Sequence, residues 1–174
     1  MEIQATPKVK CIIGFIYAND CDLLACINHL EKVYGPSDII SEDYHFDITD
    51  YYESEMGKTL KRKFISYIKL IEPQQLVEVK RISNIIEGYY IKGQGRSINL
   101  DPGYLDMDKF VLASAKYGRQ KIYLDKGIYA DPTLYFFKKE FHAYDWSFPD
   151  FSSGIYNDFF VRVRAQYKQQ IKKI

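Results

Sequence analysis

The sequence predicts a single α+β domain, because its periodic segments follow the order strand, helix, strand, strand, helix, strand over the first hundred residues. That order is the ferredoxin-like split βαβ motif, βαββαβ. The length of 174 residues suits one hydrophobic core, and no linker rich in Pro, Gly or Ser divides the chain. We therefore expect residues 1–174 to form one domain, in which an antiparallel hairpin and a C-terminal helix extend the core.

The first three elements occupy residues 8–48. A continuous apolar run over 8–18 predicts a strand that is buried on both faces. Asn19-Asp20 is expected to cap a helix that ends near Tyr34, and Gly35-Pro36 stops it. One apolar stripe supports this helix: Leu23, Leu24, Ile27, Leu30 and Tyr34. The more polar segment 39–48 is expected to be a strand.

The next elements complete the motif. Residues 59–71 alternate basic and apolar side chains, which predicts a strand with Lys61, Lys63 and Lys69 on one face and Phe64, Ile68 and Leu70 on the other. Pro73 suits the first position of a helix, and helical spacing of apolar residues continues to Gly93. Residues 97–100 form a short strand, and Asp101-Pro102-Gly103 is expected to be a turn.

The second half predicts more strands and a last helix. Residues 110–115, 120–124 and 128–137 are expected to be strands. Asp125-Lys126-Gly127 joins the last two as a three-residue hairpin loop, with Gly where a positive φ is needed. From about Gly154 onward, one apolar stripe predicts a helix that continues to the end of the chain.

Charge and composition limit the partners. Lys+Arg number 24 and Asp+Glu 23, so a net charge of +1 provides no general field for nucleic-acid phosphates, and we do not expect a nucleic-acid partner. No stretch approaches the ~20 apolar residues that span a bilayer, so we expect no membrane partner. Three cysteines without a C-x-x-C pair fit a reducing compartment, and we expect a cytoplasmic location.

The segment 45–57 is the most unusual one, because it places four carboxylates, a histidine and two tyrosines between two predicted strands. Crowded carboxylates repel one another unless a cation, a donor or a proton intervenes, so a metal ion or a raised pKa is one interpretation. The alternative is a solvated loop in which Asp47 or Asp50 caps a turn. The candidate residues of this segment are Asp47, Tyr51, Tyr52 and Glu55.

A second polar group lies near residue 100. Strand alternation lets Arg96, Asn99 and Asp101 present their side chains to a pocket at the end of the strand, and Tyr104 follows them. Asp-Pro-Gly by itself is ordinary turn chemistry, which is the alternative interpretation.

Two further groups are candidates. Lys80, Asn84 and Glu87 lie along one line of the predicted helix and can reach the same pocket, or they form a solvated helix shoulder. The only Trp, Trp146, stands near Asp150 in an aromatic loop, which is either a lid that stacks on a ligand or a plug over the end of the core.

Taken together and in this order, these segments resemble a family of prokaryotic proteins known as the domain of unknown function 4416. The match extends over residues 7–170 and is carried by Phe46-Asp47-x-Thr49-x-Tyr51-Tyr52-x-x-Glu55-Met56-Gly57, Lys80, Asn84, Glu87, Arg96-x-x-Asn99-x-Asp101-Pro102-Gly103-Tyr104, Ile122-Tyr123-Leu124, Gly127-Ile128-Tyr129-Ala130, Thr133-Leu134 and Trp146-x-x-Pro149-Asp150-Phe151. The resemblance implies no particular activity. It implies that the acidic Tyr-Tyr segment and the Asn-x-Asp-Pro-Gly-Tyr segment contribute to one shared site. Asp131-Pro132 departs from the family pattern, in which a Glu is followed by a residue other than proline.

Two classes of function follow, and the sequence leaves open whether the protein is an enzyme. The first is a site for a small anionic or phosphate-bearing ligand, or a metal-dependent enzyme, in which Asp47, Glu55 and Asp101 hold Mg²⁺ or Mn²⁺. Asp47, Glu55, Asp101 and Arg96 are then the candidate catalytic residues. The expected ligand contacts are Lys80, Asn84, Glu87, Asn99, Tyr51, Tyr52, Tyr104, Trp146 and Asp150. The alternative is a non-catalytic protein-interaction module, in which the same groups form a buried polar network.

Overall fold

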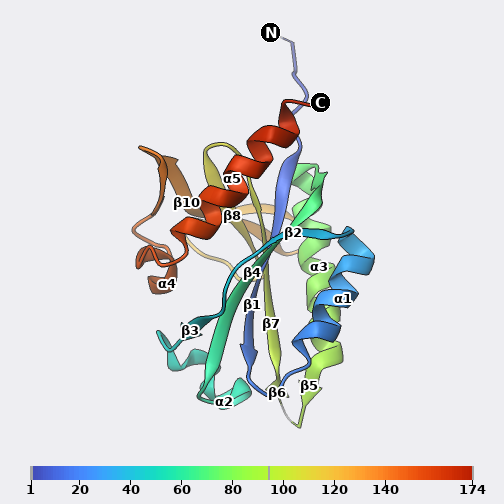
Figure 1. Ribbon diagram of the computed structural model, residues 1–174, viewed down its shortest axis with the longest axis vertical. Helices are drawn as coiled ribbons and strands as arrows, with labels where there is room; N and C mark the ends of the chain where they lie inside the picture. The colour runs from blue at the N-terminus through green and yellow to red at the C-terminus, as the bar shows by residue number, and fades with distance from the viewer. Residues whose placement is uncertain (1, 94, 174) are drawn as a thin grey trace.

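The computed structural model describes residues 2–93 and 95–173, and it shows a mixed α/β domain built on a curled antiparallel sheet (Figure 1). The strand order is β11-β10-β8-β7-β1-β4-β2, with β3 paired to β4 and β9 paired to β10. The strands are β1 (Val9–Ala18), β2 (Ser37–Ile40), β3 (Tyr44–Phe46), β4 (Leu60–Ile71), β7 (Ile98–Leu105), β8 (Lys109–Ser114), β9 (Ile122–Asp125), β10 (Ile128–Phe137) and β11 (Glu140–Ala143), and a separate pair is formed by β5 (Ile91–Lys92) and β6 (Gly95–Arg96). The helices are α1 (Leu23–Tyr34), α2 (Glu53–Met56), α3 (Leu76–Glu87), α4 (Pro149–Ser152) and α5 (Asn157–Ile171), with 3₁₀ turns η1 (Asp50–Tyr52), η2 (Pro73–Gln75) and η3 (Gly88–Tyr90).

The central strand β1 is buried along its whole length, as its apolar run predicts. It pairs antiparallel with β4 on one side and β7 on the other. Cys11 and Ile13 on one face pack into the core under α1 and α3, whereas Ile12 on the other face packs with α5. Helices therefore cover both faces of the sheet, and this leaves β1 no solvated side.

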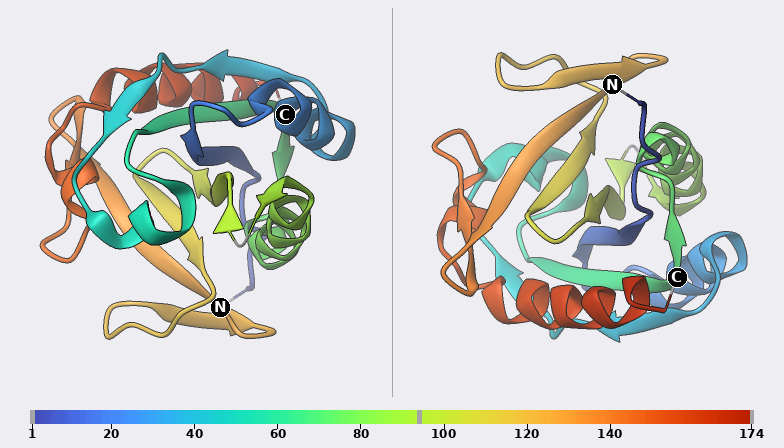
Figure 2. Two further views of the ribbon diagram at one scale, coloured as in Figure 1. Left: turned by 90° about the horizontal axis from the view of Figure 1, so that it is seen from below. Right: turned by 90° about the horizontal axis from the view of Figure 1, so that it is seen from above.

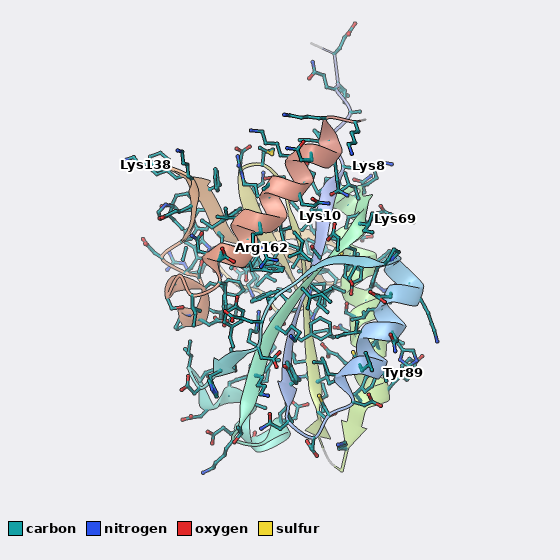
Figure 3. The ribbon with its side chains drawn as sticks, in the orientation of Figure 1. Lys8, Lys10, Lys69, Tyr89, Lys138 and Arg162 are labelled. Carbon is teal, nitrogen blue, oxygen red and sulfur yellow. The ribbon has the colours of Figure 1, made fainter. Side chains whose placement is uncertain are left out.

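The C-terminal helix α5 lies across the upper part of the sheet in Figure 1. Phe160 and Val163 pack with Phe64 and Phe110 in one aromatic core. Near the end of the helix, the fully buried Lys10 forms an ion pair with Asp38 and donates to Gln170 Oε1 at 2.9 Å. Figure 3 shows Lys10 beside α5, in contrast to Lys69 and Lys138 at the periphery.

The prediction of one continuous strand over 39–48 is wrong, because two separate strands, β2 and β3, occupy this region. Ser41 explains the break: its Oγ accepts a hydrogen bond of 2.9 Å from the Phe64 N–H, a donor that a neighbouring strand carbonyl would otherwise engage. The expected stripe of α1 also needs a correction, since Leu24 is exposed and Cys26 is buried instead. Likewise, both faces of β4 contribute to the core, because Ile65 and Tyr67 are buried among the basic residues of the face that was expected to be polar.

The turn expected at Asp101-Pro102-Gly103 is wrong, since these residues lie within β7. Pro102 is tolerated there because it pairs with Ile13 of β1 on one side, while pairing with β8 begins only at Gly103. A Cβ on Gly103 would lie 2.6 Å from the carbonyl oxygen of Val111, so the close approach of β8 requires glycine. The sheet therefore opens between β7 and β8 on the N-terminal side of Gly103.

The second half departs from expectation in detail. Asp125 pairs with Ile128, so the hairpin loop has two residues instead of three, and both Lys126 (φ 51°) and Gly127 (φ 77°) have positive φ. The helix expected from Gly154 begins at Asn157, and β11 and α4 were not predicted. Figure 2 shows the β9 hairpin standing away from the rest of the domain.

Candidate functional site

A cavity of about 670 Å³ lies where β7 and β8 diverge. This volume falls within the range of about 300–1,000 Å³ that is typical of small-molecule sites. The walls come from α3, the split strands β7 and β8, the central strands, the η1 turn and α4. The polar lining residues are Thr49, Tyr51, Tyr52, Arg62, Lys80, Asn84, Glu87, Arg96, Asn99, Asp101, Ser114, Lys116, Lys121, Asp131 and Asp150.

Two side chains of α3 close the open edge of β7. Glu87 accepts a hydrogen bond of 2.6 Å from the Leu100 N–H, and Lys80 donates one of 2.9 Å to the Leu100 carbonyl. The seven-residue spacing places both side chains on the same line of the helix. The N–H and the carbonyl of Leu100, which β8 would otherwise pair with, thus have hydrogen-bond partners on α3. The sheet can therefore remain open beside the cavity.

Arg62 and Asp101 meet across the central strand. Arg62 Nη1 donates to Asp101 Oδ2 at 2.7 Å, although Arg62 is only 2% exposed. Gly14 of β1 lies between them, and a Cβ there would lie 3.2 Å from Arg62 Nη2, so glycine leaves room for the guanidinium. The guanidinium carbon also lies 4.8 Å from the ring centroid of Phe64, a cation–π contact.

Arg96 connects the two signature segments. It donates to Glu55 at 2.7 and 3.0 Å, to Glu87 at 2.7 Å and to Asn99 Oδ1 at 3.0 Å. Asn99 Nδ2 in turn donates to Asp101 Oδ1 at 2.9 Å. The hydrogen bonds from Arg96 hold the pKa of Glu55 below its usual range. A continuous polar network therefore extends from the acidic Tyr-Tyr segment to Asp101.

Asp150 provides a second carboxylate near Arg62. It is buried, lines the cavity from α4, and accepts a hydrogen bond of 3.2 Å from the Tyr156 hydroxyl. Burial raises the pKa of Asp150, while the positive charge of Arg62 opposes this shift. Two carboxyl groups in different environments beside one cation are an arrangement that acid–base chemistry uses. Burial thus favours the protonated carboxyl of Asp150, and the charge of Arg62 favours the ionised form.

The cationic side chains of the cavity differ in their partners. Arg62, Arg96 and Lys121 are paired with carboxylates, and Lys121 lies 3.3 Å from Asp131. Within residues 2–93 and 95–173, no carboxylate pairs with Lys80 or Lys116. Lys116 Nζ instead lies 2.5 Å from the Tyr51 hydroxyl. The cavity thus presents two ammonium groups without a protein counter-ion in the described structure.

The structure places the expected site residues in three groups. Most line the cavity: Tyr51, Tyr52, Lys80, Asn84, Glu87, Arg96, Asn99, Asp101 and Asp150. Glu55 lies behind Arg96, whereas Asp47, Tyr104 and Trp146 are not among the lining residues. Trp146 stacks on Tyr144 at 4.8 Å and donates to the Pro132 carbonyl, so the observed contacts of its ring are internal.

The expected metal ligands do not converge. Asp47 is exposed, Glu55 is bound to Arg96, and Asp101 is bound to Arg62. In the part of the chain that the structure describes, no group of three or more His, Cys, Asp or Glu side chains could hold a metal ion. These residues therefore do not fit a metal ion that is held by the protein alone.

Several lining residues were not predicted. Arg62 carried a signal, because it lies on the face of the 59–71 strand that otherwise holds mostly apolar residues, and a cation there needs a buried partner. Lys116 and Lys121 carried none, since their positions depend on how β8 and β10 close the far side of the cavity. The sequence indicates Asp131 only as a departure from the family pattern, and Phe148 only as part of the aromatic loop around Trp146.

Comparisons with known proteins give one relationship. No curated protein and no solved structure matches the chain. In the described residues, no helix is both long enough and apolar enough to cross a membrane. The model of one protein family, described as domain of unknown function (DUF4416), matches residues 7–167, nearly the whole chain. The protein therefore belongs to the DUF4416 family.

Proposed function

We propose that the cavity binds a small anionic molecule, such as a phosphate ester, and that Lys80 and Lys116 supply the positive charge it meets. One observation carries the proposal: Lys80 is only 9% exposed, and its ammonium, which has three donors, has one acceptor among the described residues, the Leu100 carbonyl. Burying an ammonium without a counter-charge is costly. An anionic ligand in the cavity would supply the missing charge and acceptors.

The rigidity of the walls supports this proposal. Arg96, Glu87 and Asn99 hold one another through hydrogen bonds, and Arg62 is fixed against Asp101. Side chains that are already oriented lose little freedom when a ligand enters, so more of the contact energy appears as affinity. The polar walls of the cavity are therefore preorganised for ligand binding.

We propose that a divalent cation binds in the cavity only when the anionic ligand is also bound. Phosphate oxygens and protein carboxylates are both hard ligands that suit Mg²⁺ or Mn²⁺. Asp101 and Asp150 line the same cavity, but both oxygens of Asp101 already accept hydrogen bonds from Arg62 and Asn99, so such an ion would take most of its oxygens from the ligand phosphate and from water. The metal alone would then bind weakly, and metal with phosphate would bind more tightly.

A protein-interaction module is the second candidate function. It is favoured by exposed aromatic and aliphatic side chains on and before β9, outside the cavity: Tyr117, Ile122 and Tyr123. A cavity of about 670 Å³ lined by the signature residues supports the ligand site instead, because an interaction module has no need of one. A folded protein that responds to no anion would favour the interaction module.

We also propose that part of the sheet is a ferredoxin-like core. The supporting observation is the order β7-β1-β4-β2, with α1 between β1 and β2 and α3 between β4 and β7 along the chain. The three cysteines, all free thiols, support the proposal of a reducing, cytoplasmic compartment.

A thermal-shift screen tests the ligand site. Inorganic phosphate, pyrophosphate, small carboxylates and phosphate esters are added alone and with Mg²⁺ or Mn²⁺. A ligand at 100 times its dissociation constant stabilises the fold by about 2.7 kcal/mol, which is roughly 5–10 °C for a chain of this size. We expect the shift to be lost in Lys80→Met and retained in Lys69→Met, an exposed lysine. An equal shift in both variants, or none in the native protein, would refute the site.

A further inference from the structure

The mouth of the cavity carries exposed apolar side chains beside the exposed polar residues Thr49, Asn84 and Lys116. Three lining residues belong to the large hydrophobic side chains that remain accessible: Ile48 at 40%, Tyr51 at 61% and Phe148 at 56%. They come from two segments about a hundred residues apart in sequence. Single exposed apolar residues need no explanation, but a group at the entrance of a cavity indicates a binding surface.

The two aromatic rings at the mouth differ in their contacts. Tyr51 is held in place, because it meets Tyr52 edge-to-face at 4.9 Å and Lys116 Nζ lies 4.8 Å from its ring centroid. Phe148, directly before α4, forms no ring–ring or cation–π pair within residues 2–93 and 95–173. Together with its exposure of 56%, this leaves the Phe148 ring open to solvent at the mouth.

The interior of the cavity has the opposite character. The buried Lys80 contributes an ammonium that no carboxylate pairs with in the described residues, whereas the charge of Arg96 is already paired with Glu55 and Glu87. Asn84, exposed on α3, contributes an amide that can donate and accept. A ligand that fits both regions has an anionic group at one end and a flat apolar group at the other. Inorganic phosphate would leave the apolar mouth unused.

We infer that the ligand is a phosphate monoester of a planar ring system, of which a nucleoside monophosphate is the simplest biological form. This inference rests on the proposed function, since it requires the anion site at Lys80. The phosphate lies beside the buried Lys80, and the ring stacks on Phe148, with Tyr51 and the neighbouring Lys116 at its edge. Stacking of a base on an aromatic side chain strengthens binding by roughly 5- to 150-fold.

Calorimetric titration with four probes tests the inference: inorganic phosphate, ribose 5-phosphate, adenosine and adenosine 5′-monophosphate. We expect the monophosphate to bind at least about 5-fold more tightly than ribose 5-phosphate, because only the former has a ring to stack. The variant Phe148→Ala should abolish this difference. The matched control Phe137→Ala, whose side chain is 55% exposed and outside the cavity, should preserve it.

The outcomes separate the two proposals. Suppose that ribose 5-phosphate and adenosine 5′-monophosphate bind with equal affinity and that both bind more weakly to Lys80→Met. This result would overturn the proposal of a planar ring but would still support the anion site. A preference for the ring that persists in Phe148→Ala would overturn the stacking position. If adenosine were the only probe to bind, or if no probe bound at all, the anion site would be overturned, and with it this inference.

Discussion

Arg96 and Glu55, 41 residues apart in the chain, form an ion pair with two contacts, Nε to Oε1 at 2.7 Å and Nη2 to Oε2 at 3.0 Å. The pair attaches the segment formed by η1 and α2 to β6. The same segment places Tyr51 and Tyr52 in the wall of the cavity. The position of these tyrosines therefore depends on a contact far from them in sequence.

The variant Gly95→Ala tests this attachment. A Cβ at residue 95 would overlap the main-chain oxygen of Glu55 and lie 2.9 Å from its Cγ, so the segment must move. We expect faster hydrogen exchange over residues 50–57, since the moved segment loses part of its contact with Arg96. Gly118→Ala is the matched control, because its nearest atoms belong to the flexible side chain of Lys121 at 3.1 Å. Unchanged exchange in Gly95→Ala would contradict the role given to this contact.

The two buried lysines should differ in their effect on stability. Lys10→Met leaves the carboxylate of Asp38 without its ion-pair partner, and breaking a buried pair costs about 3–5 kcal/mol. Lys80→Met removes a hydrogen bond from a charged donor to the Leu100 carbonyl, which costs about 1.5–3 kcal/mol, but it also removes an ammonium that is buried without a counter-charge, so we expect a smaller net loss than for Lys10→Met. Urea denaturation of both variants measures the difference. If Lys80→Met costs as much as Lys10→Met, Lys80 is a structural residue and the ligand proposal loses its main support.

The stability of Asp150→Asn should depend on pH differently from that of the native protein. Because burial raises the pKa of Asp150 in the fold, its contribution to stability is fully present below the unfolded pKa of about 3.9 and is lost as pH rises through the folded value. The amide cannot ionise, so the variant should gain stability relative to the native protein from about pH 4 upward. Chemical denaturation across this range measures the gain, with the exposed Asp47→Asn as control.

The opposite sign would be informative. If the native protein becomes more stable relative to Asp150→Asn as pH rises, the positive charge of Arg62 outweighs the cost of burying the carboxylate, and Asp150 is ionised in the fold. Asp150 would then be a poor candidate for holding a proton in the cavity.

Local patterns predicted the elements that depend on their own residues. The apolar run of β1 and the bounds of β10 needed no knowledge of their neighbours, because burial on both faces and turn residues are visible in sequence. The break after β2 could not be predicted, since it depends on Ser41 accepting from Phe64 across the sheet. The turn at Asp101-Pro102-Gly103 was wrongly predicted for the same reason. A proline usually ends a strand, but here the N–H that Pro102 lacks would lie where β8 is no longer paired with β7.

The site was predictable to a similar degree. Polar residues that share one short segment, such as Arg96 and Asp101, could be recognised together. Arg62 was missed because its partner lies two strands away and is reached only over Gly14. Asp47 is exposed and does not line the cavity, and crowding of carboxylates in sequence could not indicate which of them face the interior.

The most direct test of the anion site is an anomalous diffraction measurement on crystals grown with tungstate, a tetrahedral anion that resembles phosphate. The proposed anion site should give a tungsten peak inside the cavity, within hydrogen-bonding reach of Lys80 Nζ, and that peak should be lost in crystals of Lys80→Met. Tungsten peaks at surface lysines alone, with none in the cavity, would contradict it.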